Sequence, residues 1–255
     1  MSYHAKKSYG QHFLIQSTMI EKIAKLILSF SSKNVLEIGP GKAALTKEII
    51  SHIPEFLAVE ADKDMISFLE NLFPDKKNNF IAADFLKLNI ESLFNGEEFL
   101  LCGNFPYNIS SQIVFKALDN IERIPVLIGM FQKEMAQRIV SPPGSKDYGV
   151  ISAITALYYS GKLEFDIGPS NFQPAPKVMS SILVLKRNEN IISIQERKRV
   201  RTLIKTSFLH RRKTLRNNLK SILIDKSILD EPYYNQRAEE ISPMEYLRLS
   251  RELNF

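Results

Sequence analysis

The sequence is poor in cysteine and has no long apolar run. It contains a single cysteine, Cys102, in 255 residues. A lone cysteine excludes an internal disulfide and a metal site built from several cysteines, which favours a reducing compartment. No stretch approaches the ~20 apolar residues of a membrane-spanning helix, and residues 1–7 are polar where a secretion signal has its apolar core. We therefore expect a cytoplasmic protein with no membrane contact, and we predict no metal site.

The chain also lacks internal repeats and low-complexity tracts. Hydrophobic residues make up 44% of it and charged residues 24%, as in a soluble globular protein. A chain of this length folds as one large domain, or as one large and one small domain, with enough core to be stable without disulfides. We expect it to be a monomer.

Positive charge is concentrated in one segment. Residues 184–220 carry 12 basic and 2 acidic side chains, whereas residues 1–183 carry 18 and 19 and residues 221–255 carry 4 and 7. The net charge of +6 therefore comes from residues 184–220. Such a block can be a solvated helix face, but the scarcity of acidic neighbours favours a polyanionic partner.

Short apolar strands alternate with helix-period segments over the first three quarters of the chain. We predict strands around residues 34–38, 55–62, 79–84, 99–103, 125–131, 162–167 and 178–186, and helices at 18–28, 64–73, 133–140 and 150–159. Crossover helices make neighbouring strands parallel and cover both faces of a sheet. The pattern therefore predicts an α/β fold with a mostly parallel, seven-stranded sheet.

The remaining chain reads as a separate helical part. Residues 187–195 resemble a linker, and helices are predicted at 195–208, 210–223 and 243–253. We therefore divide the chain into a domain of residues 1–187 and a small all-α domain of residues 188–255.

Polar residues follow several of the predicted strands at the point where each strand ends. Glu37 and Gly39, Glu60, Asp84 and Asn104 stand at four such ends. Ligands of open α/β sheets bind beyond the carboxyl ends of the strands. Any one of these acids could cap a helix instead, but four strand ends together favour a shared binding crevice.

Residues 99–107 combine a buried strand with a stiff polar loop, and an ordinary strand-to-helix turn with a buried tyrosine is the alternative. The strand stops at Gly103, and Asn104, Phe105, Pro106 and Tyr107 follow. Proline fixes its own φ angle and keeps the residue before it extended. A flipped-out adenine could stack on the Tyr107 ring while its amine donates to the Asn104 carbonyl.

The glycine turn after the first strand of this series has two readings. Residues 39–44 satisfy the dinucleotide pattern G-x-G-x-x-A, with Glu60 about twenty residues on, which would suit NAD. Glu37, however, is unhelpful beside a pyrophosphate and useful beside a cation. With Glu60 for ribose hydroxyls and Asp84 for an adenine amine, this acidic rim suits S-adenosylmethionine better.

These motifs resemble, in order and over nearly the whole chain, those of the small-subunit rRNA adenine N6-dimethyltransferases of the KsgA/RsmA type. The matching residues are 11–14, 37–41, Glu60, Asp84, 103–108, 131–134, 148–149, 172–178 and 211–219. The resemblance implies a Rossmann-like class I methyltransferase domain and methylation, twice each, of two adjacent adenines in the 3′-terminal hairpin of 16S rRNA, within a small ribosomal subunit or its precursor.

The resemblance also implies site residues. The cofactor-binding candidates from motif and resemblance are Gln11, His12, Leu14, Glu37, Gly39, Gly41, Glu60, Asp84 and Asn104. The catalytic candidates are Asn104, Pro106, Tyr107 and Phe172. Two positions depart from the family pattern: His12 stands where asparagine is common, and Phe105 stands where an aliphatic residue is more usual, so that the adenine slot could differ.

The basic segment supplies the candidates for RNA contact. They are Arg197, Arg201, Arg211, Arg212, Lys213 and Arg216, with Lys198, Arg199, Lys205, His210 and Lys220 beside them, and some of these are expected to be structural. Arg212 and Arg216 are four residues apart, so they should share a helix face and contact phosphate.

Three other functions compete with this interpretation. The first is an antibiotic-resistance methylase that acts on large-subunit rRNA with the same catalytic core. The second is a ribosome-assembly or transcription factor that has lost the reaction, and the third is a nicotinamide oxidoreductase. The basic C-terminal motif favours the small-subunit enzyme over the first, and the intact set of polar site residues argues against the second.

Overall fold

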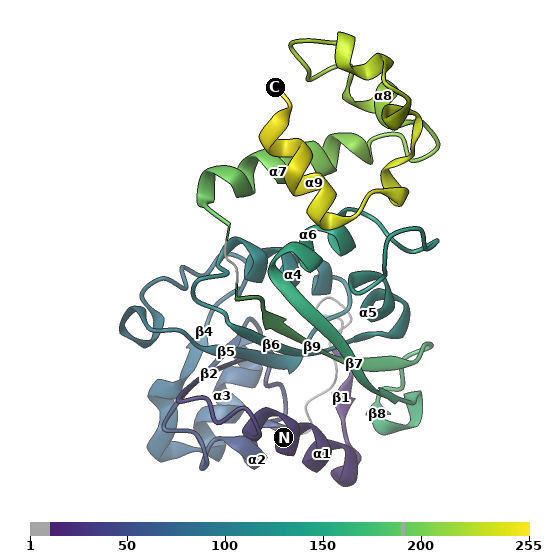
Figure 1. Ribbon diagram of the computed structural model, residues 1–255. Helices are drawn as coiled ribbons and strands as arrows, with labels where there is room; N and C mark the ends of the chain where they lie inside the picture. The colour runs from purple at the N-terminus through teal and green to yellow at the C-terminus, as the bar shows by residue number, and fades with distance from the viewer. Residues whose placement is uncertain (1–10, 190–191) are drawn as a thin grey trace. The chain divides into compact units, whose positions relative to one another are not determined.

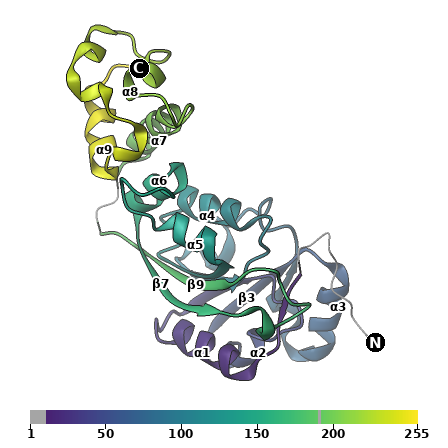
Figure 2. The same ribbon diagram turned by 90° about the vertical axis from the view of Figure 1, so that its right-hand side faces the viewer.

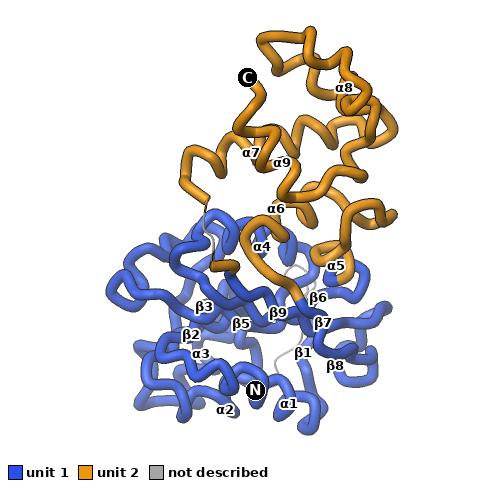
Figure 3. The backbone as a smooth tube through the Cα atoms, in the orientation of Figure 1, with its two compact units in different colours: residues 1–136, 162–187 blue, residues 137–161, 188–255 orange. Residues whose placement is uncertain are grey.

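The computed structural model describes residues 11–189 and 192–255, so the polar segment of residues 1–7 lies outside the described residues. The chain forms two compact units, which Figure 3 draws in different colours. Unit 1 is the chain through Ala136 together with Lys162–Arg187, and unit 2 is Gln137–Gly161 together with Asn188–Phe255.

The central sheet has seven strands in the order β4-β3-β2-β5-β6-β9-β7 (Figure 1). Their bounds are β2 Asn34–Ile38, β3 Glu55–Glu60, β4 Phe80–Ala82, β5 Leu100–Asn104, β6 Val126–Gln132, β7 Tyr159–Ile167 and β9 Ser180–Arg187. Strands β4, β3, β2, β5 and β6 are parallel to one another, and β9 pairs antiparallel with β6. The predicted α/β class and the mostly parallel, seven-stranded sheet are confirmed.

Helices cover both faces of this sheet, as parallel strands require. The helices that begin in unit 1 are α1 Ser17–Leu28, α2 Thr46–Ile49, α3 Lys63–Leu72, α4 Ser110–Asp119 and α5 Lys133–Ile139. Figures 1 and 2 show α1, α2 and α3 on one face and α4 on the other. Strand β2 is buried along its whole length, which explains why it reads as a continuous apolar run around one glutamate.

A second sheet of two strands belongs to unit 1, and sequence patterns do not predict it. Strand β1, Phe13–Leu14, pairs antiparallel with β8, Phe172–Gln173. Short 3₁₀ helices lie at Pro74–Asn79, Leu93–Gly96 and Pro169–Asn171. The β1–β8 pairing joins two segments about 160 residues apart in the chain, so local sequence pattern alone cannot reveal it.

Unit 2 is helical and includes residues that the sequence analysis assigned to the first domain. Its helices are α6 Val150–Tyr158, α7 Ile194–Ser207, α8 Leu215–Leu219 and α9 Pro243–Glu252, with 3₁₀ helices at Ser227–Asp230, Pro232–Asn235 and Ala238–Glu240. Helix α6 packs against α7 and α9, and the buried Tyr148 donates to the Ile241 carbonyl at 3.0 Å. Residues 137–161 therefore cluster with the C-terminal segment, and a single cut between residues 187 and 188 does not separate the two units.

The predicted helix over residues 210–223 is wrong in extent, because only Leu215–Leu219 is α-helical. The buried Asn218 side chain causes the difference. Its Oδ1 accepts from the His210 amide at 3.2 Å, and its Nδ2 donates to the carbonyls of Ser207 at 2.6 Å and His210 at 3.2 Å. These bonds hold residues 208–213 in a turn in place of a helical ladder.

Candidate functional site

A cavity of about 510 Å³ lies within unit 1, at the carboxyl ends of the parallel strands. All nine cofactor-binding candidates line it, as do Pro106 and Tyr107. The structure therefore brings together side chains from five segments that are distant in the sequence. Where parallel strands end, their following residues meet at the same edge, and this explains the convergence.

The glycine turn after β2 forms one wall of this cavity. Gly39 has φ +65° and Gly41 has φ +53°, a backbone region that residues with a Cβ atom rarely adopt. A Cβ atom on Gly41 would also lie 2.9 Å from the Phe13 ring. The turn thus brings the Gly41 amide within 3.2 Å of Glu60 Oε2, to which it donates.

Two buried carboxyl groups face the cavity from β2 and β3. Glu37 accepts a hydrogen bond from the Thr46 hydroxyl at 2.8 Å, and Glu60 Oε1 accepts from the Asp62 amide at 2.9 Å. Burial raises the pKa of Glu37 to about 8, and the neighbouring Glu60 charge adds to the rise. Burial also raises the pKa of Glu60. Carboxyls of this kind are stabilised in their ionised form by a positively charged ligand.

Asp84 occupies a more open position at the end of β4. Its side chain is 44% exposed, and Oδ1 accepts from the Leu86 amide at 2.9 Å. The segment it begins is held by Lys116 of α4, whose ammonium donates to the carbonyls of Phe85 at 2.5 Å and Leu88 at 2.6 Å. Sequence reasoning missed both Phe85, which lines the cavity, and Lys116, because no spacing rule links them.

Asn104 is the last residue of β5 and Tyr107 lies on the loop that follows it, and the side chain of each makes a hydrogen bond. Asn104 Nδ2 donates to the His12 carbonyl at 2.8 Å, and the Tyr107 hydroxyl lies 2.7 Å from the buried Ser180 hydroxyl. The Pro106 carbonyl accepts from the Ile109 amide at 3.1 Å, which leaves one of its two lone pairs. The loop therefore presents an amide oxygen, a carbonyl and an aromatic ring to the cavity.

Two further aromatic residues named from the sequence are buried, Phe172 away from the cavity and Phe105 at its wall. Phe172 is 3% exposed and packs in the core cluster through the β1–β8 pairing, so it is not among the residues that line the cavity. Phe105 is 1% exposed and meets Phe131 edge to face, with ring centroids 5.2 Å apart. The Phe105 ring is accommodated against Gly129, where a Cβ atom would lie 2.2 Å from it.

In unit 2, half of the predicted RNA contacts are engaged by the protein itself. Arg197 is buried and its Nε donates to the Ile192 carbonyl at 2.9 Å, and the Arg201 guanidinium lies over the Tyr158 ring at 5.6 Å. Arg211 pairs with Glu239 at 3.0 Å and donates to the carbonyls of Lys146 and Tyr148.

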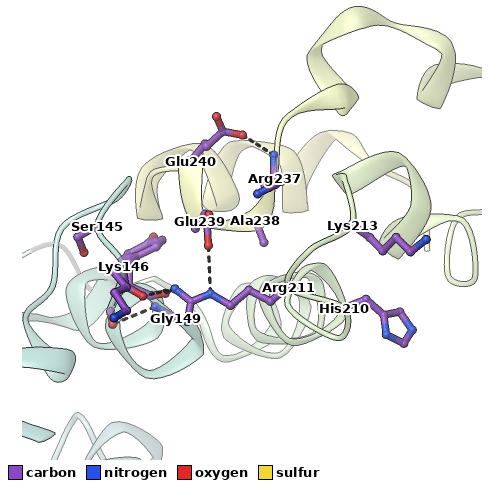
Figure 4. Close-up of polar contacts among 12 residues, drawn as sticks. Ser145, Lys146, Gly149, His210, Arg211, Lys213, Arg237, Ala238, Glu239 and Glu240 are labelled. Carbon is purple, nitrogen blue, oxygen red and sulfur yellow. Dashed lines mark hydrogen bonds and ion pairs between the residues drawn. The ribbon is translucent and has the colours of Figure 1, made fainter. Parts of the chain in front are cut away.

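The other three RNA-contact candidates are Arg212, Lys213 and Arg216. Arg212 and Lys213 are exposed, and Arg216 is partly buried. Figure 4 shows the Arg211 guanidinium turned towards Glu239 and the loop of residues 145–149, whereas His210 and Lys213 point the other way. Because α8 begins at Leu215, Arg212 precedes the helix, and the prediction that it shares a helix face with Arg216 is wrong.

Residues 11–189 and 192–255 contain no group of three or more His, Cys, Asp or Glu side chains arranged to hold a metal ion. Within the same ranges, no helix is both long and apolar enough to cross a membrane.

Comparisons with known proteins agree with this geometry. The chain is 41% identical over 254 residues to a Porphyromonas gingivalis protein named ribosomal RNA small subunit methyltransferase A, covering 98% of both chains. A dimethyladenosine transferase structure from Plasmodium falciparum matches with a TM-score of 0.77 and 23% identity, over 94% of this chain and 97% of that one. The structure of the 23S rRNA methyltransferase ErmE matches with a TM-score of 0.68 and 23% identity, over 94% and 99%.

The two structural matches fall below 25% identity, so they support the fold alone. The family assignment comes from the sequence. The model of the ribosomal RNA adenine dimethylase family matches residues 2–254, nearly the whole chain, and this protein belongs to that family.

Proposed function

We propose that this protein uses S-adenosylmethionine to methylate, twice each, the N6 amines of two adjacent adenines in the 3′-terminal hairpin of 16S rRNA, within a small ribosomal subunit or its precursor. The observation that carries the proposal is one cavity of unit 1, which is lined both by the acidic residues at the strand ends and by residues Asn104 to Tyr107. One space thus contains groups for a cationic methyl donor and for an extruded purine.

The cavity residues fit this donor by their chemistry. Glu60 offers carboxylate oxygens to ribose hydroxyls, and Asp84 offers an acceptor to an adenine amine. The pKa of the buried Glu37 is raised, and a positive ligand bound in the cavity would favour its ionised form. Gln11, His12 and Leu14 bring a further wall from the chain before α1. When bound, S-adenosylmethionine supplies an electrophilic methyl group.

Residues Asn104 to Tyr107 contact the adenine N6 amine, which accepts the methyl group. The N6 lone pair of adenine is delocalised into the ring, and it becomes nucleophilic only as the nitrogen turns tetrahedral. Hydrogen bonds from N6 to Asn104 Oδ1 and to the Pro106 carbonyl favour that geometry and stabilise the developing positive charge. Tyr107 holds the base in line and its ring face tolerates a cationic centre. No general base is required, because the transient cationic amine is acidic enough to lose its proton to water.

The direct test is to map methylated nucleotides by mass spectrometry after incubation with unmethylated small subunits, naked 16S rRNA and large-subunit rRNA. We expect dimethylation of the two adjacent adenines of the 3′-terminal hairpin. Modification of large-subunit rRNA alone would show that the protein is instead a methylase of the resistance type.

Asn104→Ala tests the assignment of the site. Loss of one oriented acceptor should lower kcat by roughly 10²–10³-fold while binding of RNA persists. Asn71→Ala, at an exposed position near the end of α3, is the matched control and should behave as the unmodified protein. Near-normal turnover of the Asn104 variant would remove the role given to this amide. Calorimetric titration with S-adenosylmethionine and with NAD separates the methyltransferase from the oxidoreductase alternative.

The exposed residues Arg212 and Lys213 are proposed to contact the phosphate backbone of the rRNA, with Arg216 beside them. Phosphate contacts of this kind supply affinity that falls steeply with salt. Arg197, Arg201 and Arg211 are assigned primarily to holding unit 2 together, because their side chains already contact the protein.

A further inference from the structure

His12 contacts three separate parts of the predicted methyl-acceptor site, although it lies in the segment before β1. Its carbonyl accepts from Asn104 Nδ2 at 2.8 Å, and its ring stacks against Tyr107 with centroids 5.5 Å apart and planes 25° from parallel. Its Nδ1 lies 2.8 Å from the Pro174 carbonyl. One residue thus joins the amide, the aromatic ring and the chain that follows β8.

The contact with Asn104 decides which way its amide faces. A carbonyl oxygen only accepts hydrogen bonds, so the amide nitrogen of Asn104 must be the atom turned towards His12. Oδ1 is then the atom left for a ligand. In this orientation the side chain accepts a hydrogen bond from the adenine amine, which retains an N–H group both before the first methylation and before the second.

The contact with Tyr107 decides which face of that ring is available. A base placed between two rings needs a centroid separation of about 7 Å, twice a stacking distance of roughly 3.5 Å. His12 and Tyr107 are 5.5 Å apart, so no base fits between them. His12 therefore covers one face of the Tyr107 ring, and the hydroxyl of Tyr107 forms a hydrogen bond with Ser180 at 2.7 Å.

The His12 ring is itself held in place. Because the Pro174 oxygen is a carbonyl, Nδ1 carries the hydrogen and donates it, which fixes one nitrogen of the ring as a donor. The antiparallel pairing of Phe13 with Gln173 supports the same neighbourhood. Loss of the ring would remove the stacking contact with Tyr107. It would also remove the hydrogen bond that holds the main chain of residue 12, whose carbonyl orients Asn104.

We propose that His12 is a positioning residue for the methyl acceptor, which orients the Asn104 amide through its carbonyl and restricts the base to the far face of Tyr107 through its ring. This inference rests on the proposed function. It differs from a role in cofactor binding alone, because its effect passes through Asn104 and Tyr107 and falls on the rate of the chemical step.

The test compares His12→Phe, which keeps a stacking ring, with His12→Asn, which keeps a donor for the Pro174 carbonyl but has no ring. Single-turnover rates are measured on unmethylated small ribosomal subunits at saturating S-adenosylmethionine, beside the KM for S-adenosylmethionine. We expect His12→Asn to lower the rate about tenfold with a smaller effect on this KM, and His12→Phe to lose less of the rate than His12→Asn, because its ring still stacks against Tyr107.

A double-mutant cycle shows whether the effect passes through Tyr107. In a Tyr107→Ala background, His12→Asn should lower the rate by less than about twofold, because the ring it supports is absent. An equal tenfold loss in both backgrounds, or a change in the KM for S-adenosylmethionine alone, would overturn the proposal. If the unmodified protein does not methylate the subunits, the proposed function is wrong. That result is distinct from a failure of the His12 proposal, which is judged by comparing variants of an active protein.

Discussion

The predicted cofactor-binding residues of unit 1 and the predicted RNA-contact residues of unit 2 differ in how many of them lie where the sequence predicts. In unit 1, all nine cofactor-binding candidates line one cavity. In unit 2, the basic residues divide: Arg211 turns back onto Glu239 and two backbone carbonyls, while Arg212 beside it is exposed. Two adjacent arginines thus differ in the contacts that they make with the protein.

The difference comes from what positions each side chain. A residue at the end of a parallel strand is placed by the sheet, and its direction follows from the strand. An arginine in a turn carries a long side chain with five N–H donors, so it satisfies protein carbonyls as readily as phosphate. Charge counts identify a basic segment, but they do not distinguish the arginines that bind a partner from those that stabilise the unit.

The largest expected effect is a loss of stability from crowding at Gly129 of β6, which packs against the Phe105 ring. Gly129→Ala places a methyl group within 2.2 Å of the Phe105 ring, which is 1% exposed, and within 2.7 Å of the Phe131 ring. Overpacking of this kind costs about 1–3 kcal/mol, and we expect the upper end or beyond because both β5 and β6 would have to shift. Urea unfolding followed by circular dichroism measures the loss.

The matched variants make this prediction specific. Gly149→Ala in unit 2 adds the same methyl group where no atom lies within 4 Å, and it should leave stability nearly unchanged. Phe105→Leu removes the ring that Gly129 accommodates, so the double variant Phe105→Leu with Gly129→Ala should recover much of the lost stability. A Gly129→Ala protein as stable as the Gly149 variant would contradict the packing described here.

Most of the large unit could be predicted because its signals are local and repeated. Each parallel strand is a short apolar run, and polar residues mark where each run ends, so the sheet and the composition of the cavity follow together. The β1–β8 pair and the contact of His12 with Tyr107 were missed, because they join residues near the N-terminus to residues about 90 to 160 positions later. Phe172 was assigned to the site from a motif, and packing against the core placed it elsewhere.

The second expected effect concerns the buried acids of the cavity. The pKa of Glu37 is about 8 in the folded protein, against 4.5 as its ordinary value, so between pH 5.5 and 7.5 the folded chain keeps a proton that the unfolded chain releases. Stability from this group is therefore complete below about pH 4.5 and is lost as the pH rises towards 8. The loss is about 1.4 kcal/mol per pH unit for one proton, or roughly 2–3 kcal/mol over this range.

Glu37→Gln removes this titration while keeping an oxygen that accepts from Thr46. Unfolding in urea at pH 5.5 and at pH 7.5 should show a smaller loss of stability with rising pH in the variant than in the unmodified protein. An identical pH dependence of the two proteins would mean that Glu37 is ionised throughout this range. Burial in the cavity would then not raise the pKa of this carboxyl group.

The third effect separates two adjacent arginines of unit 2. Arg211→Ala should lower stability by about 1–2 kcal/mol, because it removes hydrogen bonds to the Tyr148 and Lys146 carbonyls and an ion pair with Glu239. Arg212→Ala should leave stability within about 0.5 kcal/mol and weaken rRNA binding, with the salt dependence reduced by about one unit of slope.

Filter binding over a series of salt concentrations, together with thermal unfolding, measures both quantities for each variant. Lys226→Ala, which alters an exposed charge of unit 2 outside the basic segment, is the control for a general effect of charge. Equal losses of RNA affinity in the Arg211 and Arg212 variants, without a loss of stability in either, would show that both side chains serve the partner.

The smallest effect is expected from the Tyr107 hydroxyl, and it tests how firmly the acceptor loop is held. Tyr107→Phe keeps the ring face but removes the hydrogen bond to Ser180, so stability should fall by about 1 kcal/mol and kcat by a few-fold. Tyr107→Ala removes the stacking surface as well and should cost far more activity for a similar loss of stability. Because Ser180 is fully buried, Ser180→Ala should reproduce the Tyr107→Phe result. Agreement between these two variants would show that the pinned hydroxyl positions the ring, and that the ring face makes the larger contribution to turnover.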